Sequence, residues 1–201
     1  MGRPRALPDW PPGPPRPGAP GDEVHLWLAE REPGSPGAER ILRAVLGRYL
    51  EGEPEAIAIE PAPSGKPRLA ERPERLRFNL SHSGDLVLVG IAAVEIGVDV
   101  ERVAPRRAHL AIAERRLGEA AATAVREAGE ERRAQVFTER WARFEASQKC
   151  LGLGVFDPAP AEDAVAVASL DVGPGYAAAF ALQAGRLCPG EPNKRAWSLL
   201  G

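Results

Sequence analysis

The chain has few lysines, few cysteines and no long apolar run. Only three of its 201 residues are lysines, and a formal net charge of −2 argues against the positive field of a nucleic-acid-binding protein. No apolar run approaches the roughly 20 residues that a membrane helix requires, and no signal-peptide core follows the first methionine. Two cysteines, Cys150 and Cys188, are too few for a disulfide framework. We therefore expect a cytoplasmic protein with no membrane and no nucleic-acid partner.

Proline, glycine and apolar periodicity divide the chain. Residues 1–21 are expected to form a flexible lead-in, because proline blocks regular strand pairing. An N-terminal lobe is predicted for residues 22–104, a C-terminal lobe for residues 105–184 and a tail for residues 185–201. The first lobe should hold a helix over residues 38–50 and strands near 24–28, 56–60, 77–80, 86–93 and 95–103. The last two of these strands are predicted to pair as an antiparallel hairpin.

Helical sequence dominates the first part of the second lobe. It extends over about residues 108–135, with interruptions near Gly118 and Gly129. The strongest helix is predicted over residues 137–151, and glycines at 152 and 154 predict its end. Two strands are predicted to follow, over residues 164–171 and 176–184, joined by a Gly-Pro-Gly turn. The two lobes therefore have a similar make-up of strands and helices.

Two carboxylates, Asp99 and Glu101, are separated by one residue within an apolar strand. Alternate residues of a strand point to the same face, so these side chains should lie together while Val98 and Val100 point into a core. Adjacent carboxylates repel unless a proton or cation lies between them, and Mg²⁺ prefers oxygen ligands. A solvent-facing strand edge is the alternative, but the apolar residues on both sides favour a metal site.

Three further polar segments carry candidate site residues. Trp141, Glu145 and Lys149 lie four residues apart and share one helix face, which alone is typical of a surface ion pair worth about 0.3–0.5 kcal/mol. Residues 64–67 (Ser-Gly-Lys-Pro) and 81–84 (Ser-His-Ser-Gly) both predict turns. In the second turn, a capping role for His82 competes with ligand binding.

Taken together, these segments resemble the motifs of 4′-phosphopantetheinyl transferases of the surfactin-synthetase-activating type. The motifs in chain order are Gly65-Lys66-Pro67, Phe78-Asn79-Leu80-Ser81-His82-Ser83-Gly84, Gly97-Val98-Asp99-Val100-Glu101 and Trp141…Glu145-Ala146…Lys149. The second and third motifs are specific as a pair at this separation. The resemblance implies an α+β fold of two similar lobes, related by a pseudo-two-fold axis, with coenzyme A in the cleft between them.

The resemblance also implies a reaction and its residues. The phosphopantetheine arm of coenzyme A would move to a serine of an acyl, polyketide or peptidyl carrier protein, leaving adenosine 3′,5′-bisphosphate. Asp99, Glu101 and Glu145 would bind Mg²⁺, with Glu145 also the general base and Lys149 stabilising the leaving group. The implied coenzyme A contacts are Lys66 and Pro67 at the adenine end, and Ser81, His82 and Lys149 at the phosphates. Pseudo-symmetry within one chain favours a monomer.

This sequence departs from the family pattern at two places. Phe144 stands where the pattern Trp-x-x-Lys-Glu-Ala has lysine, and a phenyl ring cannot neutralise phosphate. The adjacent Arg143 should point about 100° away around the helix. No lysine precedes Lys66, so either Arg31, Arg40 or Arg43 binds the 3′-phosphate of coenzyme A, or this phosphate is held loosely. Phe144 favours an alternative, a degenerate homologue that binds coenzyme A or carrier protein without efficient transfer, whereas the intact carboxylates and Lys149 favour an enzyme.

Overall fold

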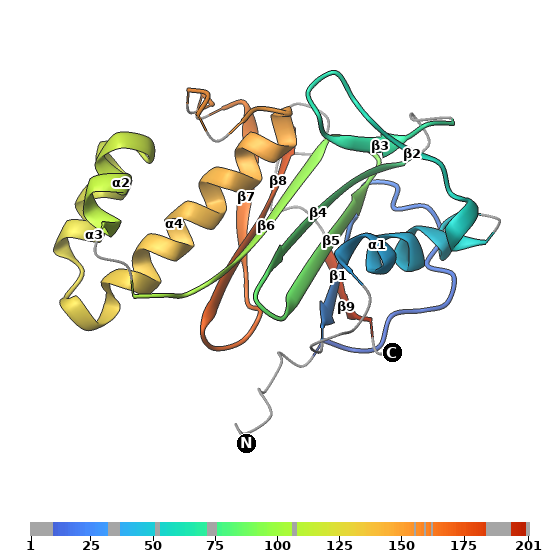
Figure 1. Cartoon of the computed structure of the whole chain (residues 1–201), viewed down its shortest axis with the longest axis horizontal. Helices are drawn as coiled ribbons and strands as arrows, with labels where there is room; N and C mark the ends of the chain where they lie inside the picture. Colours follow the sequence, from blue (N-terminus) through green and yellow to red (C-terminus); the bar gives the residue numbers. More distant parts are fainter. Residues whose placement is uncertain are drawn as a thin grey trace.

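Two β-sheets, with helix α1 on one side and helix α4 on the other, form the body of the chain in the computed structural model (Figure 1). The structure describes residues 10–31, 37–50, 53–71, 76–105, 108–154, 156–158, 160–161, 163–183 and 194–199. Its elements are β1 (Val24–Glu30), α1 (Ala38–Gly47), the short 3₁₀-helix η1 (Pro54–Ala56), β2 (Ile59–Pro61), β3 (Pro67–Leu69), β4 (Arg77–Ser83), β5 (Leu86–Ala92), β6 (Ile96–Arg102), α2 (His109–Arg116), α3 (Glu119–Glu127), α4 (Glu130–Leu151), β7 (Val165–Leu170), β8 (Tyr176–Gln183) and β9 (Lys194–Ser198). The predicted α+β class is confirmed.

The first sheet has the strand order β4-β5-β1-β9. Strand β5 is antiparallel to both β4 and β1, and β9 runs parallel to β1 at the edge. Helix α1 covers one face with large aliphatic side chains, Leu42, Val45 and Leu46, which pack with Val87 and Val89 of β5. This apolar stripe is the one that the helical spacing predicts.

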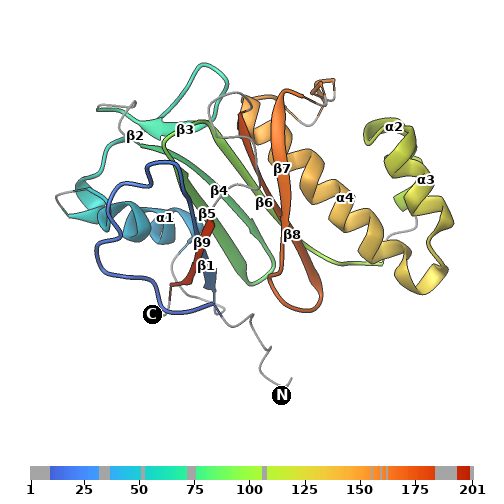
Figure 2. The same cartoon turned by 180° about the vertical axis from the view of Figure 1, so that it is seen from behind.

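The second sheet has the order β6-β8-β7, with both pairs antiparallel. Figure 2 shows the strands of the two sheets side by side from behind. The inner face of the second sheet packs against the first sheet, and the two sheets share one core. This core includes Leu26 and Leu88 from the first sheet and Val98, Val100 and Phe180 from the second. Helix α4 covers the outer face, and the layers follow as α1, first sheet, second sheet and α4.

Small residues let α4 approach the second sheet closely. Ala142, Ala146 and Cys150 pack against Ala179 and Ala181 of β8. A Cβ on Gly97 of β6 would lie 2.0 Å from the carbonyl oxygen of Ala146 and 2.3 Å from the amide nitrogen of Cys150. Only glycine fits there, because both atoms belong to helix backbone. The helix ends at Gly152, whose φ of +69° forms a left-handed cap, as the sequence predicts.

Side chains of β4, rather than a backbone ladder, meet the free edge of β6. Strand β6 pairs with β8, not with β5, so the predicted hairpin of residues 86–93 and 95–103 is wrong. The outward-facing backbone amides of β6 donate to alternate side chains of β4: Val98 N to Asn79 Oδ1 (2.8 Å), Val100 N to Ser81 Oγ (3.3 Å) and Arg102 N to Ser83 Oγ (3.0 Å). We call these three contacts the β4–β6 junction. Residues 81–83 are therefore strand rather than turn, and the turn follows at Gly84, whose φ is +56°.

Two smaller predictions need adjustment around the β2–β3 hairpin. The strand expected at residues 56–60 begins only at Ile59, because Pro54 starts a 3₁₀ turn. The turn predicted at residues 64–67 is confirmed between β2 and β3, with Gly65 at a φ of +81°. None of the helices in the described ranges is long and apolar enough to cross a membrane.

Residues near both ends of the chain contact the first sheet. Residues 194–198, expected within a tail, form β9 beside β1, and the ring of Trp197 lies 4.9 Å from that of Trp27. Within the expected lead-in, Gly13 N donates to Ser198 O (3.1 Å), and the Arg48 guanidinium donates to Gly13 O (2.9 Å). The pattern could not reveal β9, because its partner strand lies at the other end of the sequence. Residues 1–9, 184–193 and 200–201 lie outside the described residues, Cys188 among them, and the lobe boundaries stay a prediction.

Candidate functional site

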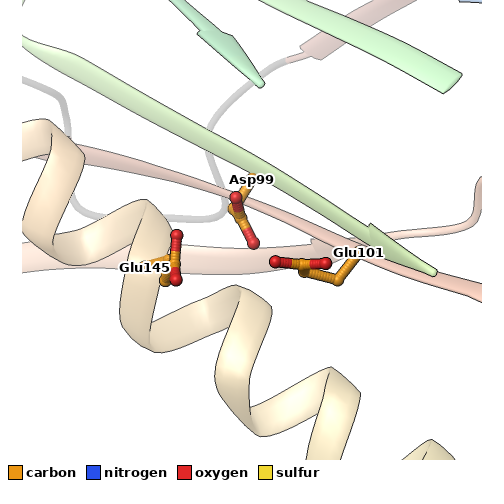
Figure 3. Close-up of side chains that lie close together, drawn as sticks. All are labelled: Asp99, Glu101 and Glu145. Carbon is orange, nitrogen blue, oxygen red and sulfur yellow. The ribbon is translucent and has the colours of Figure 1, made fainter. Parts of the chain in front are cut away.

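Three carboxylates meet between β6 and α4. Asp99 and Glu101 project from the strand toward Glu145 of the helix (Figure 3), and one oxygen of each lies within 4.8 Å of the others. Val98 and Val100 lie on the opposite face, in the core shared by the two sheets, as the alternation predicts. The close approach of α4 explains the meeting, because Glu145 precedes Ala146, the residue whose carbonyl lies over Gly97.

Lys149 lies beside this cluster. Its Nζ is 2.5 Å from Asp99 Oδ1, 3.5 Å from Glu145 Oε2 and 3.2 Å from Ser81 Oγ. Burial alone would lower the pKa of Lys149, but the negative charges of Asp99 and Glu145 outweigh it and leave the pKa raised. The lysine is therefore a cation, and it pairs with two of the three carboxylates, Asp99 and Glu145.

The Glu145 carboxyl has an unusual environment. Its burial raises the pKa above the ordinary range, and the neighbouring charge of Asp99 raises it further, while Lys149 opposes both effects. A carboxylate with a raised pKa accepts a proton more readily than one in free solution. Glu145 therefore has the properties of a general base.

Asp99 provides the test of whether a metal fits. Its side chain is 1% exposed, and among the described residues its Oδ2 atom has no hydrogen-bond partner. A buried carboxylate oxygen without a partner is costly unless a cation satisfies it. Three carboxylates around one point are the oxygen donors that Mg²⁺ prefers. The donor set fits Mg²⁺.

The residues expected at the adenine end line a separate pocket. Lys66 and Pro67 border a cavity of about 320 Å³, together with residues of β3, β4 and the C-terminal end of α4. Lys66 Nζ donates to Glu95 Oε2 (2.7 Å), to Ile96 O (2.8 Å) and to Cys150 O (3.3 Å). The lysine thus ties the β2–β3 hairpin to the start of β6 and the end of α4. Cys150 is buried, and this burial raises the pKa of its thiol to about 11.

Ser81 and His82 lie on opposite faces of β4. Ser81 is 6% exposed, and its Oγ donates to Asp99 Oδ1 (2.8 Å), whereas His82 is exposed. Sequence reasoning missed Ser83, whose Oγ donates to Glu101 Oε2 (3.0 Å). The alternation of Asn79, Ser81 and Ser83 was the available signal, but the Ser-Gly ending favoured a turn.

Phe144 lies among aromatic and cationic groups. Its ring centroid is 5.7 Å from that of Trp141, and the guanidinium carbon of Arg116 lies 5.8 Å from it. Arg143 donates to Ser169 Oγ of β7 (3.3 Å) and so does not take the place of the missing lysine. Of the arginines considered for the 3′-phosphate, Arg43 is bound to Glu39 and to Ile57 O.

Comparison with known proteins supports the resemblance drawn from the motifs. Residues 95–188 match the family model described as the 4′-phosphopantetheinyl transferase superfamily, a range that contains Asp99, Glu101, Glu145 and Lys149. The chain is 33% identical over 118 residues to the 4′-phosphopantetheinyl transferase HetI of Nostoc sp., and 32% identical over 117 residues to the 4′-phosphopantetheinyl transferase psf-1 of Bacillus pumilus. It is also 33% identical over 116 residues to slr0495 of Synechocystis sp.. The predicted resemblance is confirmed.

These matches cover part of each protein. They include 57%, 58% and 57% of this chain for HetI, psf-1 and slr0495, and 50%, 49% and 47% of those relatives. The chain therefore spans about half the length of the curated relatives it matches.

Proposed function

We propose that this chain transfers the 4′-phosphopantetheine group of coenzyme A to a serine of an apo acyl, polyketide or peptidyl carrier protein, in a Mg²⁺-dependent reaction. The observation that carries the proposal is the meeting of Asp99, Glu101 and Glu145 beside Lys149, within the range that matches the transferase family. A pyrophosphate is already rich in negative charge, so attack by a neutral hydroxyl needs charge neutralisation and a proton acceptor. This site offers both.

The chain's own residues have separate tasks in this proposal. Asp99, Glu101 and Glu145 hold Mg²⁺, which when bound supplies charge neutralisation for the pyrophosphate oxygens. Glu145 accepts the hydroxyl proton of the carrier serine while the serine oxygen forms a bond to the phosphorus that carries pantetheine. The bond from that phosphorus to the bridging oxygen breaks, and adenosine 3′,5′-bisphosphate leaves. Lys149 donates to the pyrophosphate and stabilises the charge on the leaving group.

Coenzyme A would lie between the two sheet-bearing halves. We place its adenine end in the cavity beside Lys66 and Pro67, and its phosphates near Lys149, the exposed His82 and the Ser81 edge of β4. The matching strand orders support two related lobes, because β4-β5-β1 and β7-β8-β6 both follow the order second, third, first in the chain. Helix α1 and helix α4 each follow the first strand of their half and cover its sheet.

A second candidate is a degenerate homologue that binds coenzyme A or carrier protein without efficient transfer. Phe144 favours it, since no charge stands at that position of the helix. Arg116 opposes it, because its guanidinium lies over the Phe144 ring and returns a positive charge to this neighbourhood. The partnerless Asp99 Oδ2 also opposes it, since such an atom is costly to keep without a cation.

The proposed function is tested with intact carriers. The purified chain is incubated with coenzyme A, Mg²⁺ and a panel of apo carrier proteins, and each carrier is weighed by mass spectrometry. A mass gain of one phosphopantetheine that disappears with EDTA supports the transferase. Coenzyme A binding without a gain on any carrier supports the degenerate homologue instead, and a gain that survives EDTA contradicts the metal dependence.

A further inference from the structure

The three contacts of the β4–β6 junction differ in chemistry. Asn79, Ser81 and Ser83 each accept a hydrogen bond from a backbone amide of β6. An amide oxygen can only accept, whereas a hydroxyl accepts and donates at once. The two serines use this second capacity, and both donate to carboxylates of the candidate metal site. Asn79 lies opposite Val98, where no carboxylate follows.

Ser83 is held on both sides. Arg102 N donates to its Oγ at 3.0 Å, and the same Oγ donates to Glu101 Oε2 at 3.0 Å. Because the amide occupies one lone pair, the single hydroxyl proton is directed toward the carboxylate. Glu101 is only partly buried near the end of β6. Fixing a glutamate side chain in one rotamer costs conformational entropy, which a hydrogen bond to its carboxylate offsets. The hydrogen bond restricts one oxygen of Glu101 to the side that faces Ser83.

We propose that Ser83 is a positioning residue that holds Glu101 ready to bind a divalent cation together with Asp99 and Glu145. The inference rests on the proposed metal site. It adds Ser83, a residue that touches neither the metal nor the reacting atoms. Groups that hydrogen-bond a metal ligand fix its orientation, and their loss typically weakens metal binding about 10–100-fold. Ser81 has a similar relation to Asp99, but it also accepts a bond from Lys149, so its removal would disturb several groups.

The experiment measures Mn²⁺ affinity in the presence of coenzyme A, by the electron paramagnetic resonance signal of free Mn²⁺. The variants are Ser83→Ala, Ser83→Thr and the matched control Asn79→Ala, each with its melting temperature. Ser83→Ala should bind Mn²⁺ about 10–100-fold more weakly. Ser83→Thr keeps the hydroxyl and should bind like wild type. Asn79→Ala removes a junction contact without touching a carboxylate, so its melting temperature should fall while its affinity stays unchanged.

Several outcomes would overturn the inference. Unchanged affinity in Ser83→Ala, or equal losses in Ser83→Ala and Asn79→Ala, would leave Ser83 as a structural contact only. If Ser83→Ala does not fold, Ser83→Cys replaces it, since a thiol of similar size is a weak donor and should also weaken binding; wild-type affinity there would contradict the positioning role. Absence of Mn²⁺ binding in the wild type would overturn the proposed metal site as well, which separates the two failures.

Discussion

Helices α1 and α4 each cover one face of a sheet, but they pack with side chains of different size. Helix α1 uses Leu42, Val45 and Leu46, and these large groups fill the space above the first sheet. Helix α4 uses Ala142, Ala146 and Cys150 over Gly97, so its backbone lies directly against β6. Large residues bury more apolar area, whereas small ones bring polar side chains of helix and strand within reach of one another. The packing of α1 therefore contributes mainly to stability, whereas the packing of α4 brings Glu145 and Lys149 close to the carboxylates of β6.

The largest effect is expected where α4 contributes a charge. Glu145→Gln keeps the volume but removes the proposed metal ligand and proton acceptor, so we expect transfer to a carrier to fall by more than about 10²-fold. The initial rate of carrier modification measures this loss. The unfolding free energy without metal should not fall, because the substitution relieves repulsion among three carboxylates. Retained turnover would contradict both roles of Glu145.

A smaller effect is expected where α4 touches the sheet. In Gly97→Ala the added Cβ meets helix backbone, and we expect a loss of about 1–3 kcal/mol in unfolding free energy as α4 moves outward. Denaturant unfolding measures the loss. Glu145 moves with the helix, so the transfer rate per folded molecule should fall as well.

Leu46→Ala in α1 is the matched control for Gly97→Ala. Leu46 is buried in the core under α1, and its truncation should cost about 2–5 kcal/mol of unfolding free energy. The transfer rate of the folded fraction should nevertheless stay near that of wild type. If Leu46→Ala lowered the transfer rate per folded molecule as much as Gly97→Ala does, the proposal that α4 rather than α1 positions the site residues would be wrong.

The α1 side also contains a pH-sensitive contact. Trp27 Nε1 donates to the Tyr49 hydroxyl (2.8 Å), which leaves the hydroxyl proton for Nδ1 of the buried His25 (2.9 Å). Burial lowers the pKa of His25 in the folded state despite the nearby Glu23. A lowered pKa gives stability that is present above the unfolded pKa of about 6.5 and lost as the pH falls through the folded value. Unfolding free energy should therefore decline on acidification, with a shallower slope in His25→Gln; equal slopes would contradict the assignment.

The smallest effect is expected at Phe144. Phe144→Lys restores the residue of the family pattern, and we expect carrier modification to stay the same or rise a few-fold, since one added charge near a screened phosphate contributes on the order of 1 kcal/mol. The steady-state rate at limiting coenzyme A measures it. A large loss in the rate of carrier modification would show that transfer depends on the Phe144 ring, which lies beside Trp141 and Arg116.

Local periodicity predicted much of the site. Alternation placed Asp99 and Glu101 on one face of β6, and helical spacing placed Glu145 and Lys149 on one face of α4, because both patterns depend only on near neighbours. The contact between the two faces follows from Gly97 and Ala146, whose close approach no periodicity encodes. The family resemblance supplied that link.

Contacts between distant segments were harder to predict. The β4–β6 junction replaces a backbone ladder with side chains, and so an apolar run followed by a short connection suggested a hairpin that does not form. Strand β9 pairs with β1, although most of the sequence separates the two strands. The short sequence of β9 is neither strongly apolar nor alternating. Ser83 carried a signal only in combination with Asn79 and Ser81, because a single serine before glycine is typical of a turn.

The most direct test of the proposed metal site is a crystal structure of the protein grown with coenzyme A and Mn²⁺, with anomalous scattering recorded for manganese. We expect one anomalous peak bound by carboxylate oxygens of Asp99, Glu101 and Glu145, and by the pyrophosphate. A peak elsewhere, or bound coenzyme A with no manganese among these three side chains, would contradict the role of α4 in completing the site.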